Sequence, residues 1–191
     1  MMDEILLALT PVADTFDTLS IPFFIGGSVA AASYDVKRAT NDIDLIADVR
    51  EEHAQPLDTR LSADYYADAQ MIRDAVRRKA SFNFIHFGTG LKVDVFLLKN
   101  TPYMQMQMQR RMPGVLVPGG RAFPFASPED TILAKLDWYR IGGEISDRQW
   151  NDITLLLDAK RGALDLAYMR QWAQQLGLTA LLDRAFTATS M

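Results

Sequence analysis

Hydrophobic positions change period along the first fifty residues, which predicts that helices alternate with strands. From residue 2 to residue 19 apolar side chains recur every three or four positions, as on one face of a helix, and Pro11 is expected to kink or split that helix. Residues 21–25 then form a short, bulky apolar run that is typical of a buried strand. The run ends at two glycines, where a tight turn is expected, and Ser28 is a suitable N-cap for a helix over residues 29–34.

Further strand patterns follow. Residues 42–48 alternate apolar and acidic side chains, which places one kind on each face of a strand. Residues 81–87 and 91–98 are rich in β-branched and aromatic residues, and Gly88-Thr89-Gly90 separates them. Because glycine readily adopts positive φ, this spacing predicts a β-hairpin.

The rest of the chain is expected to be mainly helical. Ser127-Pro128 combines an N-cap residue with a proline at the first helical position, and acidic residues follow it, so a helix should begin there and stop at the glycines after residue 141. Two more helices are expected over residues 146–160 and 165–176. Residues 103–121 alternate Met and Gln before two Pro-Gly turns, which favours a strand or an irregular segment.

These patterns divide the chain into two parts. Residues 1–125, with additional helices expected over 51–61 and 69–79, predict an α/β (α+β) domain in which helices flank a mixed β-sheet. Residues 126–191 predict a C-terminal helical bundle.

Composition removes several classes of protein. The 191 residues include 20 basic and 24 acidic side chains, a formal net charge of −4, which is the wrong sign for a general nucleic-acid-coating protein. The absence of Cys and the presence of only two His exclude a disulfide framework and the usual zinc sites. Hard cations with oxygen ligands remain the plausible metals.

The amino-terminal residues do not resemble a targeting segment. Asp3 and Glu4 replace the basic region of a signal peptide, and no apolar run approaches the roughly 18 residues of a membrane span. We expect a cytoplasmic protein without a membrane partner.

Three carboxylates lie where a stable core alone does not need them. Asp42 and Asp44 should point to one face of their strand, about 6.5 to 7 Å apart along the backbone, and Asp94 lies between two core-facing valines of the hairpin. If the two strands are neighbours, the three carboxylates converge and need a proton or a cation, for which Mg²⁺ is the natural candidate. The alternative for the Asp42 and Asp44 pair is a solvent-facing strand edge.

The glycine turn offers a second chemical signal. Gly26, Gly27 and Ser28 follow a strand and open a helix, which is the geometry with which backbone N–H groups approach phosphates. The alternatives are an ordinary tight turn and a nucleophile elbow at Ser28. A hydrolase is disfavoured because His86 precedes Asp94 and the acidic pair would have no role. His86 is therefore expected to be a packed or pocket-wall histidine.

These residues carry a resemblance to a known family. The chain resembles the polymerase-beta-type nucleotidyltransferase superfamily and, within it, the bacterial abortive-infection (AbiEii-like) nucleotidyltransferases. The likeness spans residues 20–160 and rests on Phe24 to Ala30, Tyr34, Arg38, Thr40, Asp42 to Leu45, Ser81 to His86, Lys92 to Phe96, and Arg148 to Asp152.

The resemblance implies a nucleotidyltransferase-type sheet and a metal-dependent enzyme. It would transfer an NMP from an NTP such as ATP to an acceptor hydroxyl and release pyrophosphate, using two Mg²⁺ ions, with Mn²⁺ as an alternative. Asp42, Asp44 and Asp94 would be catalytic and hold the metals, and Asp94 could also activate the acceptor. The nucleotide would be bound by residues of the glycine turn and two cations: Gly26, Gly27, Ser28, Arg38 and Lys135.

The acceptor stays open between RNA such as tRNA, protein and a small molecule. A role in a toxin–antitoxin or phage-defence system, with a cognate antitoxin as partner, follows only from the resemblance. The longer spacing between the glycine turn and Asp42 argues against an aminoglycoside acceptor. The basic side chains at Arg73, Arg77, Arg78 and Lys79 form either a solvated helix face or a surface that steers RNA. The Met stripe from Met104 to Met112 forms core, a surface seam or a partner site.

The rival interpretation is a non-catalytic relative that uses the same fold as a nucleotide sensor, antitoxin or interaction module.

Overall fold

The computed structural model describes residues 2–36 and 40–191 and shows a mixed β-sheet flanked by helices. Within these residues the sheet has seven strands in the order β3-β4-β5-β2-β1-β7-β6. The strands are β1 (Phe23–Ile25), β2 (Asp42–Ala47), β3 (Tyr65–Tyr66), β4 (Ser81–His86), β5 (Lys92–Leu97), β6 (Met112–Val115) and β7 (Ala122–Phe125). The β2–β5 and β1–β7 pairs are parallel and the other pairs are antiparallel, so the predicted mixed sheet is confirmed.

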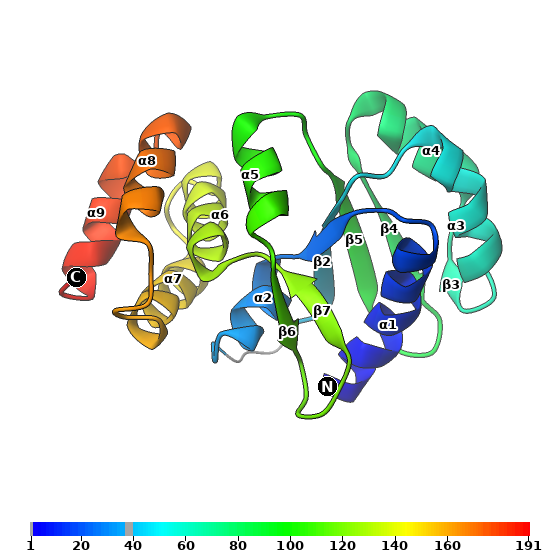
Figure 1. Cartoon of the computed structure of the whole chain (residues 1–191), viewed down its shortest axis with the longest axis horizontal. Helices are drawn as coiled ribbons and strands as arrows, with labels where there is room; N and C mark the ends of the chain where they lie inside the picture. Colours follow the sequence, from blue (N-terminus) through cyan, green and yellow to red (C-terminus); the bar gives the residue numbers. More distant parts are fainter. Residues whose placement is uncertain (1, 37–39) are drawn as a thin grey trace.

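Helices lie on both sides of the sheet (Figure 1). They are α1 (Met2–Thr18), α2 (Gly27–Ser33), α3 (Ala54–Leu61) after a short 3-10 turn (Glu51–His53), α4 (Ala69–Arg78), α5 (Pro102–Arg110), α6 (Pro128–Ile141), α7 (Asp147–Ala159), α8 (Leu166–Leu176) and α9 (Thr179–Ala188). Figure 1 shows α1, α3 and α4 on one side and α6 to α9 on the other, with α5 between. None of the described helices is long and apolar enough to cross a bilayer.

Two large apolar cores and one small apolar cluster support this arrangement. The first lies between one face of the sheet and helices α1, α3 and α4, and includes Ile43 and Val93, both without solvent exposure. The second lies inside the C-terminal helices, and Ala31 and Val36 from the sheet-containing part pack into it. The expected division at residue 125 falls between β7 and α6.

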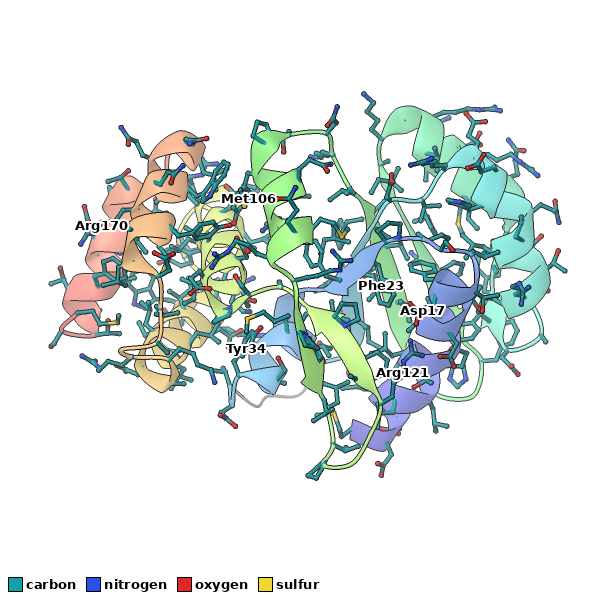
Figure 2. All side chains as sticks on the ribbon, in the orientation of Figure 1. Asp17, Phe23, Tyr34, Met106, Arg121 and Arg170 are labelled. Carbon is teal, nitrogen blue, oxygen red and sulfur yellow. The ribbon has the colours of Figure 1, made fainter. Side chains whose placement is uncertain are left out.

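Polar contacts connect segments that are far apart in the sequence. The Tyr34 hydroxyl donates a hydrogen bond to the Ala126 carbonyl, 2.6 Å away, and so ties the end of α2 to the segment before α6 (Figure 2). Arg121, next to β7, forms ion pairs with Asp14 and Asp17 of α1. These contacts fasten α1 and α2 to the second half of the chain.

The predicted helix α1 is confirmed as one helix, with Pro11 inside it. The predicted cap of α2 is wrong. Gly26 occupies the N-cap position without a side-chain cap, and the helix begins at Gly27, so that Ser28 already lies in its first turn. The two glycines let the helix begin two residues earlier than a cap at Ser28 would place it.

The expected strand or irregular segment over residues 103–121 is also wrong in its first part. Thr101 caps α5 by accepting a hydrogen bond from the Met104 N–H, and Pro102 stands at the first helical position. Gln107 and Met108 are both buried, so neighbouring residues share one buried side, as on a helix. The Met stripe is therefore mostly helical, and Met108 packs with Phe24 as core.

Candidate functional site

The parallel pairing of β2 with β5 brings the predicted carboxylates together. Asp44 lies directly beside Asp94 in the register, and Asp42 lies beside Lys92. Ile43 and Val93 alternate with them and fill the first core, so the carboxylates occupy the opposite face of the sheet. The expectation that these two strands are neighbours is confirmed.

The next strand adds a polar side chain to the same face. Asn83 of β4 pairs with Asp94 across an antiparallel ladder, so Asn83, Asp94 and Asp44 form a row over three strands. Sequence reasoning missed Asn83. Its alternation with buried Phe82 and Phe84 was the available signal.

Gly27 meets the carboxylate row at its other end. The Gly26 N–H donates to the Asp44 carbonyl at 2.9 Å, which fixes the turn against β2. Gly27 has φ +57°, and a β-carbon there would lie 1.8 Å from Asp44 Oδ2. Only glycine therefore allows this approach between the start of α2 and the Asp44 carboxylate.

The electrostatic environment of Asp44 is unfavourable for a negative charge. Burial, and then the charges of Asp94 and Asp42, raise the pKa of the Asp44 carboxyl to about 6, against the opposing effect of Lys135 and Lys92. Crowded carboxylates with a raised pKa are typical of sites that receive a cation or a proton.

Lys92 is the cation already present in this cluster. Its Nζ lies 3.0 Å from Asp94 Oδ2 and 3.8 Å from Asp42 Oδ1. The hydrogen bond to Asp94 is the main cause that raises the pKa of the Lys92 ammonium. Asp94 therefore faces Lys92 while Asp44 faces Gly27, and in the described part of the chain no three His, Asp or Glu side chains converge on a common point for a metal ion.

We compared the sequence and the structure with those of known proteins to identify the fold. No protein-family model matches the sequence, and no curated protein matches it. The solution structure of antibiotic-resistance factor ANT(2'')-Ia aligns with a TM-score of 0.59 at 14% identity and covers 100% of this chain and 97% of that chain. An antigenic nucleotidyltransferase-like protein from Paracoccidioides brasiliensis aligns with a TM-score of 0.59 at 19% identity and covers 97% of this chain and 93% of that chain.

The chain has the nucleotidyltransferase fold. A crystal structure of ANT(2'')-Ia in complex with adenylyl-2''-tobramycin also aligns, with a TM-score of 0.54 at 15% identity, over 89% of this chain and 97% of that chain. At these identities the alignments establish the shared architecture.

Within this nucleotidyltransferase fold, Lys135 comes from α6 and is 5% exposed. Its Nζ lies 2.8 Å from Asp152 Oδ2 of α7, and its charge lowers the pKa of Asp44. Lys135 therefore belongs to the electrostatic surroundings of the carboxylates while it joins two C-terminal helices. Arg38, the other predicted phosphate contact, lies outside the described residues.

The remaining sequence candidates lie outside the carboxylate row. His86 pairs with Tyr65, with ring centroids 5.0 Å apart, and its Nδ1 lies 2.9 Å from Thr89 Oγ1, so it is packed as expected. On the basic face of α4, Arg77 forms an ion pair with Glu51 at 2.8 Å and Arg73 donates to Gln55 at 3.2 Å. These contacts fit a solvated helix face.

Proposed function

We propose that this protein is a metal-dependent nucleotidyltransferase, which transfers an NMP from an NTP to an acceptor hydroxyl and releases pyrophosphate. The observation that carries the proposal is the register pairing of Asp44 with Asp94, next to a glycine turn that touches Asp44. The shared fold supports it, because one neighbour with this architecture is named nucleotidyltransferase-like.

The donor chemistry fits a hard divalent cation. Asp42, Asp44 and Asp94 supply carboxylate oxygens, which Mg²⁺ prefers. Burial, and then the neighbouring carboxylates, raise the pKa of Asp44, so a nearby cation would favour its charged form. Bound Mg²⁺ or Mn²⁺, as one ion or two, would neutralise charge on the α-phosphate and on the leaving pyrophosphate.

The chain's own residues would position the reactants. In the reaction, the acceptor oxygen forms a bond to the α-phosphorus while the bond from that phosphorus to the bridging oxygen breaks, and pyrophosphate leaves. Asp94 would accept the proton of the acceptor hydroxyl, because it is exposed less than Asp42 and lies beside Asp44. Gly26, Gly27 and Ser28 would contact the phosphates.

The Lys135 ammonium already pairs with Asp152, so Lys135 would act on the nucleotide through long-range electrostatic attraction and not through direct contact. Arg38 remains a proposed phosphate contact.

Two acceptor classes are proposed in order. The resemblance to the abortive-infection group supports RNA such as tRNA as the first acceptor to test, with a cognate antitoxin as the protein partner. The complex of ANT(2'')-Ia with adenylyl-2''-tobramycin supports a small polyhydroxylated molecule as the second.

The proposal is tested by calorimetric titration of each NTP, with and without Mg²⁺, into the wild type, Asp44→Asn and Asp48→Asn. Asp48 follows β2 and pairs with Arg50, so its variant removes one nearby carboxylate outside the row. We expect Mg²⁺-dependent binding to the wild type and to Asp48→Asn, and loss of binding in Asp44→Asn. Absence of binding by all four NTPs would contradict the proposal and favour a non-catalytic module.

Transfer itself is followed with α-phosphate-labelled NTPs and tRNA, total protein or an aminoglycoside as acceptor. Label should move to one acceptor class with the release of pyrophosphate, and Asp44→Asn should abolish the transfer.

A further inference from the structure

Lys92 contacts two of the three carboxylates. The ammonium contacts Asp94 at 3.0 Å and Asp42 at 3.8 Å, and thus links β5 to β2 on the carboxylate face. The lysine stands on that face because it is two residues before Asp94 on one strand, and the register places it beside Asp42.

Asp94 and Asp44 have different close neighbours on the carboxylate face. Asp44 Oδ2 lies toward Gly27, on the α2 side of β2, while Asp94 Oδ2 lies toward Lys92. A divalent cation shared by Asp44 and Asp94 would draw on the negative charge of the Asp94 carboxylate, which the Lys92 ammonium already contacts. The same carboxylate oxygen cannot give its full negative charge to both cations.

We propose that Lys92 is a tethered competitor of the divalent cation: its ammonium occupies the carboxylates when no metal is bound and must be displaced as metal enters. The protein therefore binds free divalent cations weakly, and the nucleotide carries its metal into the site. Lys92 is a positioning residue in this scheme, since it acts through Asp94 and Asp42.

The inference rests on the proposed function, because it concerns the metal of that same site. It also makes a separate prediction, because it states whether removal of Lys92 strengthens or weakens metal binding. Removal of a lysine that only stabilises the site should weaken metal binding, whereas removal of a competitor should strengthen it.

The test is a calorimetric titration of Mn²⁺ alone, without nucleotide, into the wild type and the Lys92→Gln, Lys92→Arg and Lys99→Gln proteins. Lys99→Gln removes the same charge from an exposed position after β5, outside the carboxylate face. Lys92→Arg keeps the charge. Asp44→Asn reports whether the measured Mn²⁺ occupies the proposed site.

We expect Lys92→Gln to bind Mn²⁺ about tenfold more tightly than the wild type, since a charge-assisted contact no longer has to be broken. Lys92→Arg and Lys99→Gln should stay within about twofold of the wild type, because a tenfold change needs a whole contact to be lost. A second readout is thermal unfolding: in EDTA, Lys92→Gln should melt below the wild type, and saturating Mn²⁺ should raise its melting temperature by more than it raises that of the wild type.

Asp44-dependent Mn²⁺ binding that is unchanged or weaker in Lys92→Gln would overturn the competitor role and leave the proposed function intact. Absence of Mn²⁺ binding in both the wild type and Lys92→Gln would overturn the competitor role, and the titration of NTP with Mg²⁺ then decides the proposed function separately.

Discussion

A β-carbon at Gly27 would lie 1.8 Å from Asp44 Oδ2, so that the start of α2 and the carboxylate of β2 occupy adjoining space with no room for a methyl group. The glycine turn, which is expected to bind phosphate, is therefore in contact with the carboxylate row, which is expected to bind metal. A change at Gly27 should therefore affect both stability and ligand binding.

Gly27→Ala should destabilise the protein by more than the cost of a positive φ alone, which is about 1 to 2 kcal/mol for a residue with a side chain. The methyl group must also displace the Asp44 carboxylate. Urea unfolding measures the loss, and Gly90→Ala is the matched control, because Gly90 has φ +70° with no atom near its missing β-carbon. Equal losses in the two variants would refute the close approach.

Asp44→Asn should stabilise the metal-free protein at neutral pH. Because the pKa of the folded Asp44 carboxyl is raised to about 6, its stabilising effect is complete below the unfolded pKa of about 4 and is lost as the pH rises through 6. The gain in unfolding free energy of the Asn variant over the wild type should be near zero at pH 4 and at most about 3 kcal/mol above pH 7. The gain should fall below this limit because the Asp44 side chain keeps some solvent contact.

Urea unfolding in EDTA across pH 4–8 measures that difference. A variant that is less stable than the wild type at pH 8 would contradict the electrostatic picture of the row.

Ile43→Asp should prevent folding. Ile43 lies between Asp42 and Asp44 in the sequence, but its side chain is fully buried on the opposite, core face of a central strand. An aspartate there would place an unpaired charge in the first core. Ile43→Val should cost only about 0.5 to 1.5 kcal/mol. Circular dichroism and thermal melting compare the two, and a folded Ile43→Asp protein would show that the strand can reverse its faces.

Lys135→Met should cost about 3 to 5 kcal/mol, because the Asp152 carboxylate loses its ammonium partner inside the protein. The double variant Lys135→Met, Asp152→Leu should recover most of that loss. A double-mutant cycle of unfolding free energies measures the coupling, and NTP titration of the folded double variant separates the helix-joining role of Lys135 from its effect on nucleotide. Additive losses would contradict the buried pair.

The central features were readable from the sequence because they depend on local patterns. Alternation around Asp42 and Asp44 fixes their common face, and the hairpin glycines fix the strand that carries Asp94. The sequence could predict that the carboxylates converge only on the condition that β2 and β5 are neighbours, because no local pattern determines which strands pair.

The misses have different physical causes. The period-two alternation of Met and Gln imitates a strand in α5, although Thr101-Pro102 is a helix start of the same kind as Ser127-Pro128. Lys92 was missed as part of the site because a lysine on a strand usually points to solvent, and only the register shows that Asp42 stands beside it.

The parallel pairing of Ile25 with Phe125 sets an order on biosynthesis. A chain emerging from the ribosome can pair β2 with β5 once Leu97 is free, but β1 keeps an open edge until β7 has been translated, about a hundred residues after β1. The Lys135 ammonium can pair with Asp152 only after α7 has been translated. A nascent chain can therefore pair its carboxylate strands before α6 and α7 exist, and chaperone contact with the unpaired β1 edge is expected during that interval.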